Sequence, residues 1–223
     1  MAGTLGIVTI GQAPREDIAA LFASFAPAGT RVVLRGALDG LDDAAIAARP
    51  PVDGADTLYT RLRGGRDVKI SKRAVIERSP ATLAALRADG CEAIVYACTG
   101  EFPPMSGDAG VLFPSRVLNG LATGLLPRGR LGLLVPLPEQ AEKLAAKWAR
   151  PGVEVSVEAL LPSADPDEAT RAATRLGATK PDLVAMDCMS YTPATKDAVR
   201  AALGLPTLLA ITATGAVLRE LLE

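Results

Sequence analysis

The sequence predicts an α/β protein built from two similar halves, each a parallel sheet covered by helices, with the active site in the cleft between them. First, short apolar runs rich in β-branched residues alternate with helical patterns along the chain. Second, runs such as AIVYA and LVAM are apolar throughout, which indicates strands that are buried on both faces. Third, LGIVTIGQAPRED from Leu5 resembles LGLLVPLPEQAEK from Leu131, and EAIVYACTG around Cys98 resembles DLVAMDCMS around Cys188.

The individual elements follow from these patterns. Strands are expected at residues 5–10, 31–34, 93–97, 111–113, 131–135, 153–159, 183–186 and 207–211. Helices with apolar residues at i, i+3 and i+4 are expected at 14–25, 72–89, 115–126, 138–150, 165–176 and 193–203. Pro14, Pro138 and Pro193 suit the first turn of a helix, and Ser71 suits the N-cap of the helix that follows it.

The first half carries an insertion. Its two motifs lie further apart than those of the second half, and the segment DTLYTRLRGGRDVKI accounts for much of the difference. This segment has two β-type stretches around Gly64 and Gly65, which predicts a hairpin. We therefore expect a first domain at 1–118 plus 206–223, with the hairpin insertion near 51–71, and a second domain at 119–205. The strand and helix at the chain end are expected to complete the first half.

Charge and hydropathy narrow the function classes. The 223 residues include 24 basic and 25 acidic side chains, so nothing favours nucleic acid or an anionic membrane as a partner. The start of the chain, MAGTLGIVTIGQ, lacks the basic region and apolar run of a signal peptide. No apolar run reaches the roughly 18 residues of a membrane span. We expect a cytoplasmic protein that binds a small molecule, with no nucleic acid and no membrane as partner.

The chain contains no histidine and three cysteines without CxxC spacing. Lack of histidine excludes a Ser-His-Asp triad, a Cys-His dyad and HExxH zinc chemistry. The cysteine pattern argues against a disulfide framework or a structural zinc site. Proton transfer in this protein must therefore use Cys, Asp, Glu, Lys or Tyr side chains.

Cys98 and Cys188 are the candidate catalytic residues because each ends a buried strand. Ligands of open parallel sheets bind beyond the carboxyl ends of the strands. Backbone amides of a following turn lower the pKa of a thiol there and can also hold a carboxylate. Two thiols, one from each half, suit proton removal and return on opposite faces of one carbon. The alternative is that these cysteines pack as small apolar side chains, which is the interpretation we give to Cys91.

Other polar residues are expected beside the cleft. An arginine can hold a carboxylate with two hydrogen bonds, although an arginine at the start of a helix is also an ordinary surface residue. Asp187 is expected either to orient the neighbouring thiol or to cap backbone amides. Thr9 and Glu101 are also expected to lie beside the cleft. The substrate-binding candidates are Gln12, Arg15, Thr99, Gly100, Ser115, Arg116, Ser190, Tyr191 and Thr192.

These segments resemble a known group of proteins. YACTG and MDCMSYT are similar to the two cysteine segments of the aspartate/glutamate/hydantoin racemase superfamily, with Ser190 where that superfamily commonly has histidine. Within it, the whole chain resembles the AroM family. The segments that carry this resemblance are TIGQAPRED, VKISKRAV, FPSRVL, LGLLVPLPEQ with the following AAKW, and MDCMSYT.

The resemblance implies a racemase-like two-domain α/β fold with its site between the domains, small carboxylate substrates and no cofactor. A homodimer is expected by analogy alone. Three functions stay open. The first is a racemase or epimerase that uses Cys98 and Cys188 as acid and base. The second is a decarboxylase or a cis–trans isomerase with a nucleophilic cysteine. The third is a non-catalytic metabolite-binding protein on the same scaffold.

Overall fold

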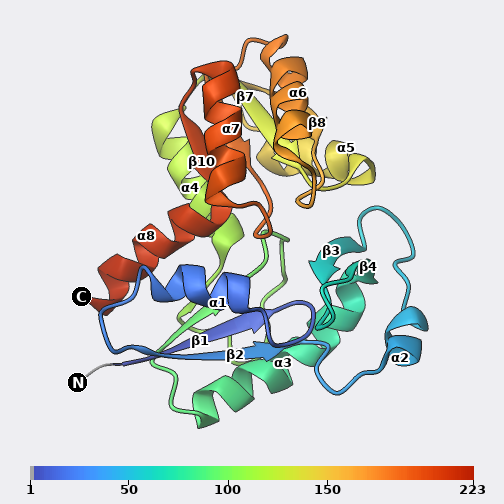
Figure 1. Ribbon diagram of the computed structural model, residues 1–223, viewed down its shortest axis with the longest axis vertical. Helices are drawn as coiled ribbons and strands as arrows, with labels where there is room; N and C mark the ends of the chain where they lie inside the picture. Colours follow the sequence, from blue (N-terminus) through green and yellow to red (C-terminus); the bar gives the residue numbers. More distant parts are fainter. Residues whose placement is uncertain (1–2) are drawn as a thin grey trace. The chain divides into compact units, whose positions relative to one another are not determined.

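A computed structural model describes residues 3–223 and divides the chain into two compact units (Figure 1). The first unit runs to Pro114 and also takes in Thr214–Glu223. The second unit is Ser115–Ala213. In the part of the chain that the model describes, no helix is long and apolar enough to cross a membrane.

The first unit contains a four-stranded parallel sheet in the order β2-β1-β5-β6. Its strands are β1 (Thr4–Thr9), β2 (Arg31–Gly36), β5 (Ala93–Tyr96) and β6 (Val111–Leu112). The helices α1 (Glu16–Ala23) and α3 (Lys72–Ala88) lie on opposite sides of this sheet (Figure 1). The Ser71 hydroxyl accepts the Ala74 N–H at 3.3 Å, which confirms the predicted N-cap of α3.

An antiparallel hairpin interrupts the first unit between β2 and α3, as the sequence predicts. It consists of β3 (Thr57–Arg61) and β4 (Asp67–Ser71), which pair along their whole length. The short helix α2 (Asp43–Ala47) precedes it and was not expected, because five residues are too few for a helical period. Asp42 caps this helix by accepting the Ala45 N–H at 2.8 Å.

The second unit repeats the plan of the first. Its parallel sheet has the order β10-β9-β7-β8, from β7 (Gly129–Val135), β8 (Val153–Ala159), β9 (Leu183–Met186) and β10 (Thr207–Leu209). Its helices are α4 (Pro114–Leu125), the 3-10 turn η1 (Pro138–Gln140), α5 (Ala141–Trp148), α6 (Pro166–Gly177), α7 (Pro193–Leu203) and the start of α8 (Ala210–Leu222). When the strands of each parallel sheet are numbered in chain order, both sheets have the spatial order second, first, third, fourth. This confirms two similar parallel halves.

Some details differ from the sequence prediction. Pro14 does not lie in a helical turn: the Ala13–Pro14 peptide bond is cis and α1 begins at Glu16. The backbone of Ala13 is hydrogen-bonded to residues of two other loops. Its N–H donates to Asp39 Oδ1 at 2.8 Å, and its carbonyl accepts from Arg63 Nε at 2.7 Å. The segment predicted as one helix at 138–150 is divided into η1 and α5.

The chain end also takes a different place from the expected one. The strand β10 pairs in parallel with β9, so it extends the second sheet and not the first. The helix α7 connects β9 to β10 and returns the chain to the free edge of β9. The backbone of β9 then forms the hydrogen bonds of β10. Only the part of α8 from Thr214 onward belongs to the first unit.

Candidate active site

Cys98 lies just beyond the carboxyl end of β5. The ladder continues for one residue past Tyr96, since the Ala97 N–H donates to the Val8 carbonyl at 2.7 Å. The chain then turns, and the Gly100 N–H points back to Cys98 Sγ at 3.3 Å. The cysteine is buried, with 7% of its surface exposed. A backbone N–H directed at a sulfur stabilises negative charge there, which is the condition for a reactive thiol.

Cys188 occupies the equivalent place after β9. The Asp187 N–H donates to the Leu134 carbonyl at 2.9 Å, and the Ser190 N–H points to Cys188 Sγ at 3.5 Å. This cysteine is likewise 7% exposed. In register, Met186 pairs with Leu134 on β7, the first strand of its sheet, just as the third strand pairs with the first in the other unit. The two cysteine loops therefore share the same hydrogen-bond pattern.

Tyr96, two residues before Cys98, packs in a group of aromatic side chains. The Tyr96 ring lies 4.7 Å from that of Phe102 and stacks at 5.3 Å on Phe113. Ser79 donates its hydroxyl hydrogen to a backbone carbonyl of α3, so Tyr96 is the donor in the 2.6 Å hydrogen bond between the two hydroxyls. Burial raises the pKa of Tyr96, and the charge of Cys98 raises it further. Tyr96 is thus a neutral side chain that ties the end of β5 to α3.

A buried ion pair lies directly before Cys188. The Asp187 side chain is fully buried, and it accepts hydrogen bonds from Lys147 Nζ at 2.9 Å and Trp148 Nε1 at 2.7 Å. Sequence reasoning named Asp187 but missed Lys147 and Trp148. The segment AAKW carried part of the resemblance, yet a lysine on a helix normally faces solvent, so nothing in the helical pattern placed this one inside.

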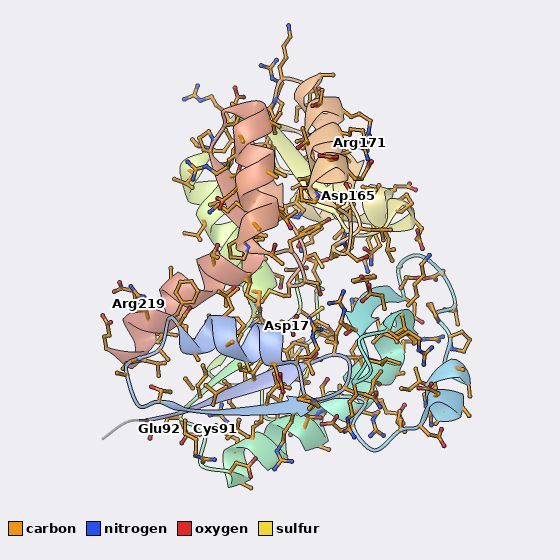
Figure 2. The ribbon with its side chains drawn as sticks, viewed as in Figure 1. Asp17, Cys91, Glu92, Asp165, Arg171 and Arg219 are labelled. Atoms are coloured by element: carbon orange, nitrogen blue, oxygen red, sulfur yellow. The ribbon has the colours of Figure 1, made fainter. Side chains whose placement is uncertain are left out.

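Two of the predicted binding residues already hold other groups. Gln12 donates to the Leu41 carbonyl at 2.8 Å and accepts the Arg63 N–H at 3.4 Å. Arg15 is buried, and its guanidinium makes two hydrogen bonds to the Asp17 carboxylate at 2.9 and 2.8 Å. Burial alone would raise the pKa of Asp17, but the hydrogen bond and positive charge of Arg15 outweigh it and lower that pKa. Figure 2 shows Asp17 at the start of α1.

Of the three candidates after Cys188, two have side chains that bind backbone groups of the fold, and one contributes its backbone N–H to the cysteine. The buried Tyr191 hydroxyl donates to the Leu160 carbonyl at 2.5 Å. Thr192 caps α7 by accepting the Thr195 N–H at 3.1 Å. Ser190 is half-buried and contributes the N–H that reaches Cys188.

The remaining candidates follow the ends of β5 and β6, two strands of the first sheet. Thr99 is buried and Gly100 is half-buried in the loop after Cys98. In the first turn of α4, Ser115 is buried and Arg116 is exposed.

Cys91 lies before the amino end of β5, the end opposite to Cys98, and next to Glu92 (Figure 2). It belongs to the hydrophobic core of that unit, and burial raises its pKa, with the charge of Asp89 acting in the same direction. Its position agrees with a packing role. Between residues 3 and 223, no group of three or more Cys, Asp or Glu side chains is placed to hold a metal ion.

Comparison with known proteins places these features in a family. The family model described as AroM protein matches residues 5–222. No curated protein sequence matches the chain.

Several solved structures share the fold. Arylmalonate decarboxylase is 13% identical with a TM-score of 0.62, covering 99% of this chain and 92% of that one. The maleate isomerase Iso from Pseudomonas putida S16 is 16% identical with a TM-score of 0.63 and the same coverage. The aspartate racemase of Picrophilus torridus is 13% identical with a TM-score of 0.57, covering 99% of this chain and 94% of that one. Identity this low establishes the racemase-like two-domain fold alone.

Proposed function

The chain belongs to the AroM family, and from this premise we propose that it is a cofactor-independent isomerase of the racemase or epimerase type. Its substrate is a small carboxylate, such as an amino acid or a hydantoin derivative. Cys98 and Cys188 act on one carbon as the two acid/base groups. The observation that carries the proposal is the matched pair of thiols, each past the third strand of its sheet with a backbone N–H at its sulfur.

The reaction requires one thiolate and one thiol at rest. The thiolate takes the proton from the carbon beside the carboxylate, so an S–H bond forms as the C–H bond breaks. The electron pair moves into the carboxylate, where backbone and hydroxyl donors stabilise the developing charge. The second thiol then delivers its proton to the opposite face of the carbon. The configuration is inverted and the two cysteines have exchanged protonation states.

Thiols suit this task because their ordinary pKa of about 8.5 lies close to neutral pH. The donors proposed to hold the substrate carboxylate are Thr99, the Gly100 amide and Ser190, with Ser115 and Arg116 at the start of α4. Arg15 has a weaker claim to this role because Asp17 occupies its two donor positions. The side chains that already hold other backbone groups also have weaker claims: these are Gln12, Tyr191 and Thr192.

A second candidate function uses the same fold for decarboxylation or for cis–trans isomerisation, the latter with a nucleophilic cysteine. Among the similar structures, one protein is named a decarboxylase and another a maleate isomerase. Decarboxylation needs one protonating thiol, whereas cis–trans isomerisation needs attack of a cysteine on carbon. A third candidate, simple metabolite binding, needs neither cysteine to react.

Hydrogen exchange separates these candidates. The protein is incubated in D2O with a pool of amino acids, hydantoins and 2-substituted dicarboxylates, and exchange at the α-carbon is followed by NMR. We expect exchange that is lost in both Cys98→Ser and Cys188→Ser and retained in the matched control Cys91→Ser, whose thiol packs in the core. Full activity in Cys188→Ser would contradict the two-thiol mechanism. A covalent adduct on Cys188 without exchange would favour the nucleophilic alternative.

A further inference from the structure

The two cysteine loops match in their backbone hydrogen bonds but differ in the residue that precedes the cysteine. In the first unit this residue is Ala97, and in the second it is Asp187. The second loop therefore carries a charged side chain one residue before a proposed acid/base group, where the first loop has an apolar one.

The carboxylate of Asp187 is compensated at the same place by a buried lysine. Side-chain exposure is 0% for Asp187 and 4% for Lys147. The Lys147 ammonium reaches both carboxylate oxygens, at 2.9 and 3.3 Å, and Trp148 Nε1 donates to one of them at 2.7 Å. Both donors come from the last turn of α5. Three donor contacts on one carboxylate give the geometry that a buried ion pair needs to offset its loss of hydration.

Anchoring alone does not explain two buried charges. A neutral Asn could accept the Trp148 hydrogen bond and tie the strand end to α5 without removing a carboxylate and an ammonium from water. An unbalanced carboxylate beside Cys188 would oppose negative charge on its sulfur, whereas an unbalanced ammonium would favour it. The pair leaves the thiol beside a site of zero net charge.

Lys147 is the cation that contacts the Asp187 carboxylate. The other charged residues of α5 are Glu142, which is exposed, and Lys143, which is half-buried. The neighbouring strands contribute apolar side chains at this level, Leu134 from β7 and Leu209 from β10, through their pairing with the end of β9. The charged residues of α7, the helix that follows the loop, are Lys196, Asp197 and Arg200, which are half-buried or exposed.

We propose that Lys147 is a positioning residue that balances the charge of Asp187, so that the carboxylate can fix the Cys188 loop without hindering ionisation of the thiol. The inference rests on the proposed role of Cys188 as an acid/base group. Lys147 acts through Asp187, and Trp148 holds the carboxylate in place.

The test is the pH dependence of Cys188 alkylation by iodoacetamide, read from the Cys188 peptide by mass spectrometry. Lys147→Met should move the midpoint to higher pH and slow alkylation at neutral pH about tenfold, the effect of one pH unit. Asp187→Asn should move the midpoint the opposite way. The double variant Lys147→Met/Asp187→Asn should return it toward the wild-type value. Trp148→Phe, which keeps both charges, should leave it unchanged.

Trp148 is the sole tryptophan, so its fluorescence reports whether each variant with this residue keeps its buried environment. Shifts in the same direction for both single variants, or no shift in folded protein, would overturn the proposal. If Lys147→Met does not fold, Asp187→Asn and the double variant still decide, because the first must shift and the second must not. Alkylation needs no substrate, so charge balance can succeed or fail independently of the proposed isomerase reaction.

Discussion

At the scale of single residues, Arg15 illustrates how a candidate for binding substrate can be committed to the fold. A carboxylate two residues along the chain occupies the same donor pair that would hold a substrate carboxylate. Sequence reasoning could not find this contact, because Arg15 and Asp17 lie at the entry to α1, where helical spacing does not yet apply. Sequence reasoning did predict that Cys98 and Cys188 lie at strand ends, because apolar runs in the sequence mark where the strands end.

The Arg15–Asp17 pair predicts a pH-dependent contribution to stability. The pKa of Asp17 is lower in the folded protein than its ordinary value of 3.8. The ionised carboxylate therefore stabilises the fold at pH values above 3.8. This contribution is lost as the pH falls below 3.8 through the folded pKa. Asp17 is 55% exposed, so solvent screening limits the contribution to about 1 kcal/mol or less.

Urea denaturation of Asp17→Asn and wild type, at neutral pH and at a pH well below 3.8, checks this contribution. We expect Asp17→Asn to be less stable than wild type at neutral pH, with the difference vanishing in acid. A difference in free energy of unfolding that is equal at both pH values would show that the carboxylate charge has no part in it.

At the scale of elements, the hairpin β3–β4 packs tightly against the loop that follows β1. A Cβ atom added to Gly11 would lie 2.6 Å from the Arg61 carbonyl oxygen and 2.7 Å from Thr60 Oγ1. The hairpin itself was predictable from its two β-type stretches and glycine turn. The packing of the hairpin on the loop after β1 was not predictable, because the contact joins segments about fifty residues apart. Local sequence patterns carry no information on such a contact.

Gly11→Ala should therefore destabilise the protein by about 1–3 kcal/mol through overpacking. Gly64→Ala is the matched control: no atom lies within 4 Å of its added Cβ, and we expect a change within about 0.5 kcal/mol. Chemical denaturation of the two variants measures the difference. Equal stability of Gly11→Ala and Gly64→Ala would contradict the close packing of the hairpin on this loop.

At the scale of the whole molecule, the repeated motifs were the most informative part of the sequence. They predicted two similar halves, and both sheets have the same strand order. They could not assign the last strand, because an apolar run such as TLLAI fits the edge of either sheet equally well. Pairing with β9 decides this, and that contact exists only after α7 has folded back.

The central claim is that two cysteines exchange a proton with one carbon from opposite faces. Its most direct test starts from one enantiomer of a substrate identified by hydrogen exchange and follows early turnover in D2O. The account predicts deuterium in the product enantiomer while the remaining substrate keeps its hydrogen, because each face meets a different thiol. Deuterium appearing equally in both enantiomers from the start, or hydrogen retained in the product, would contradict the two-thiol mechanism.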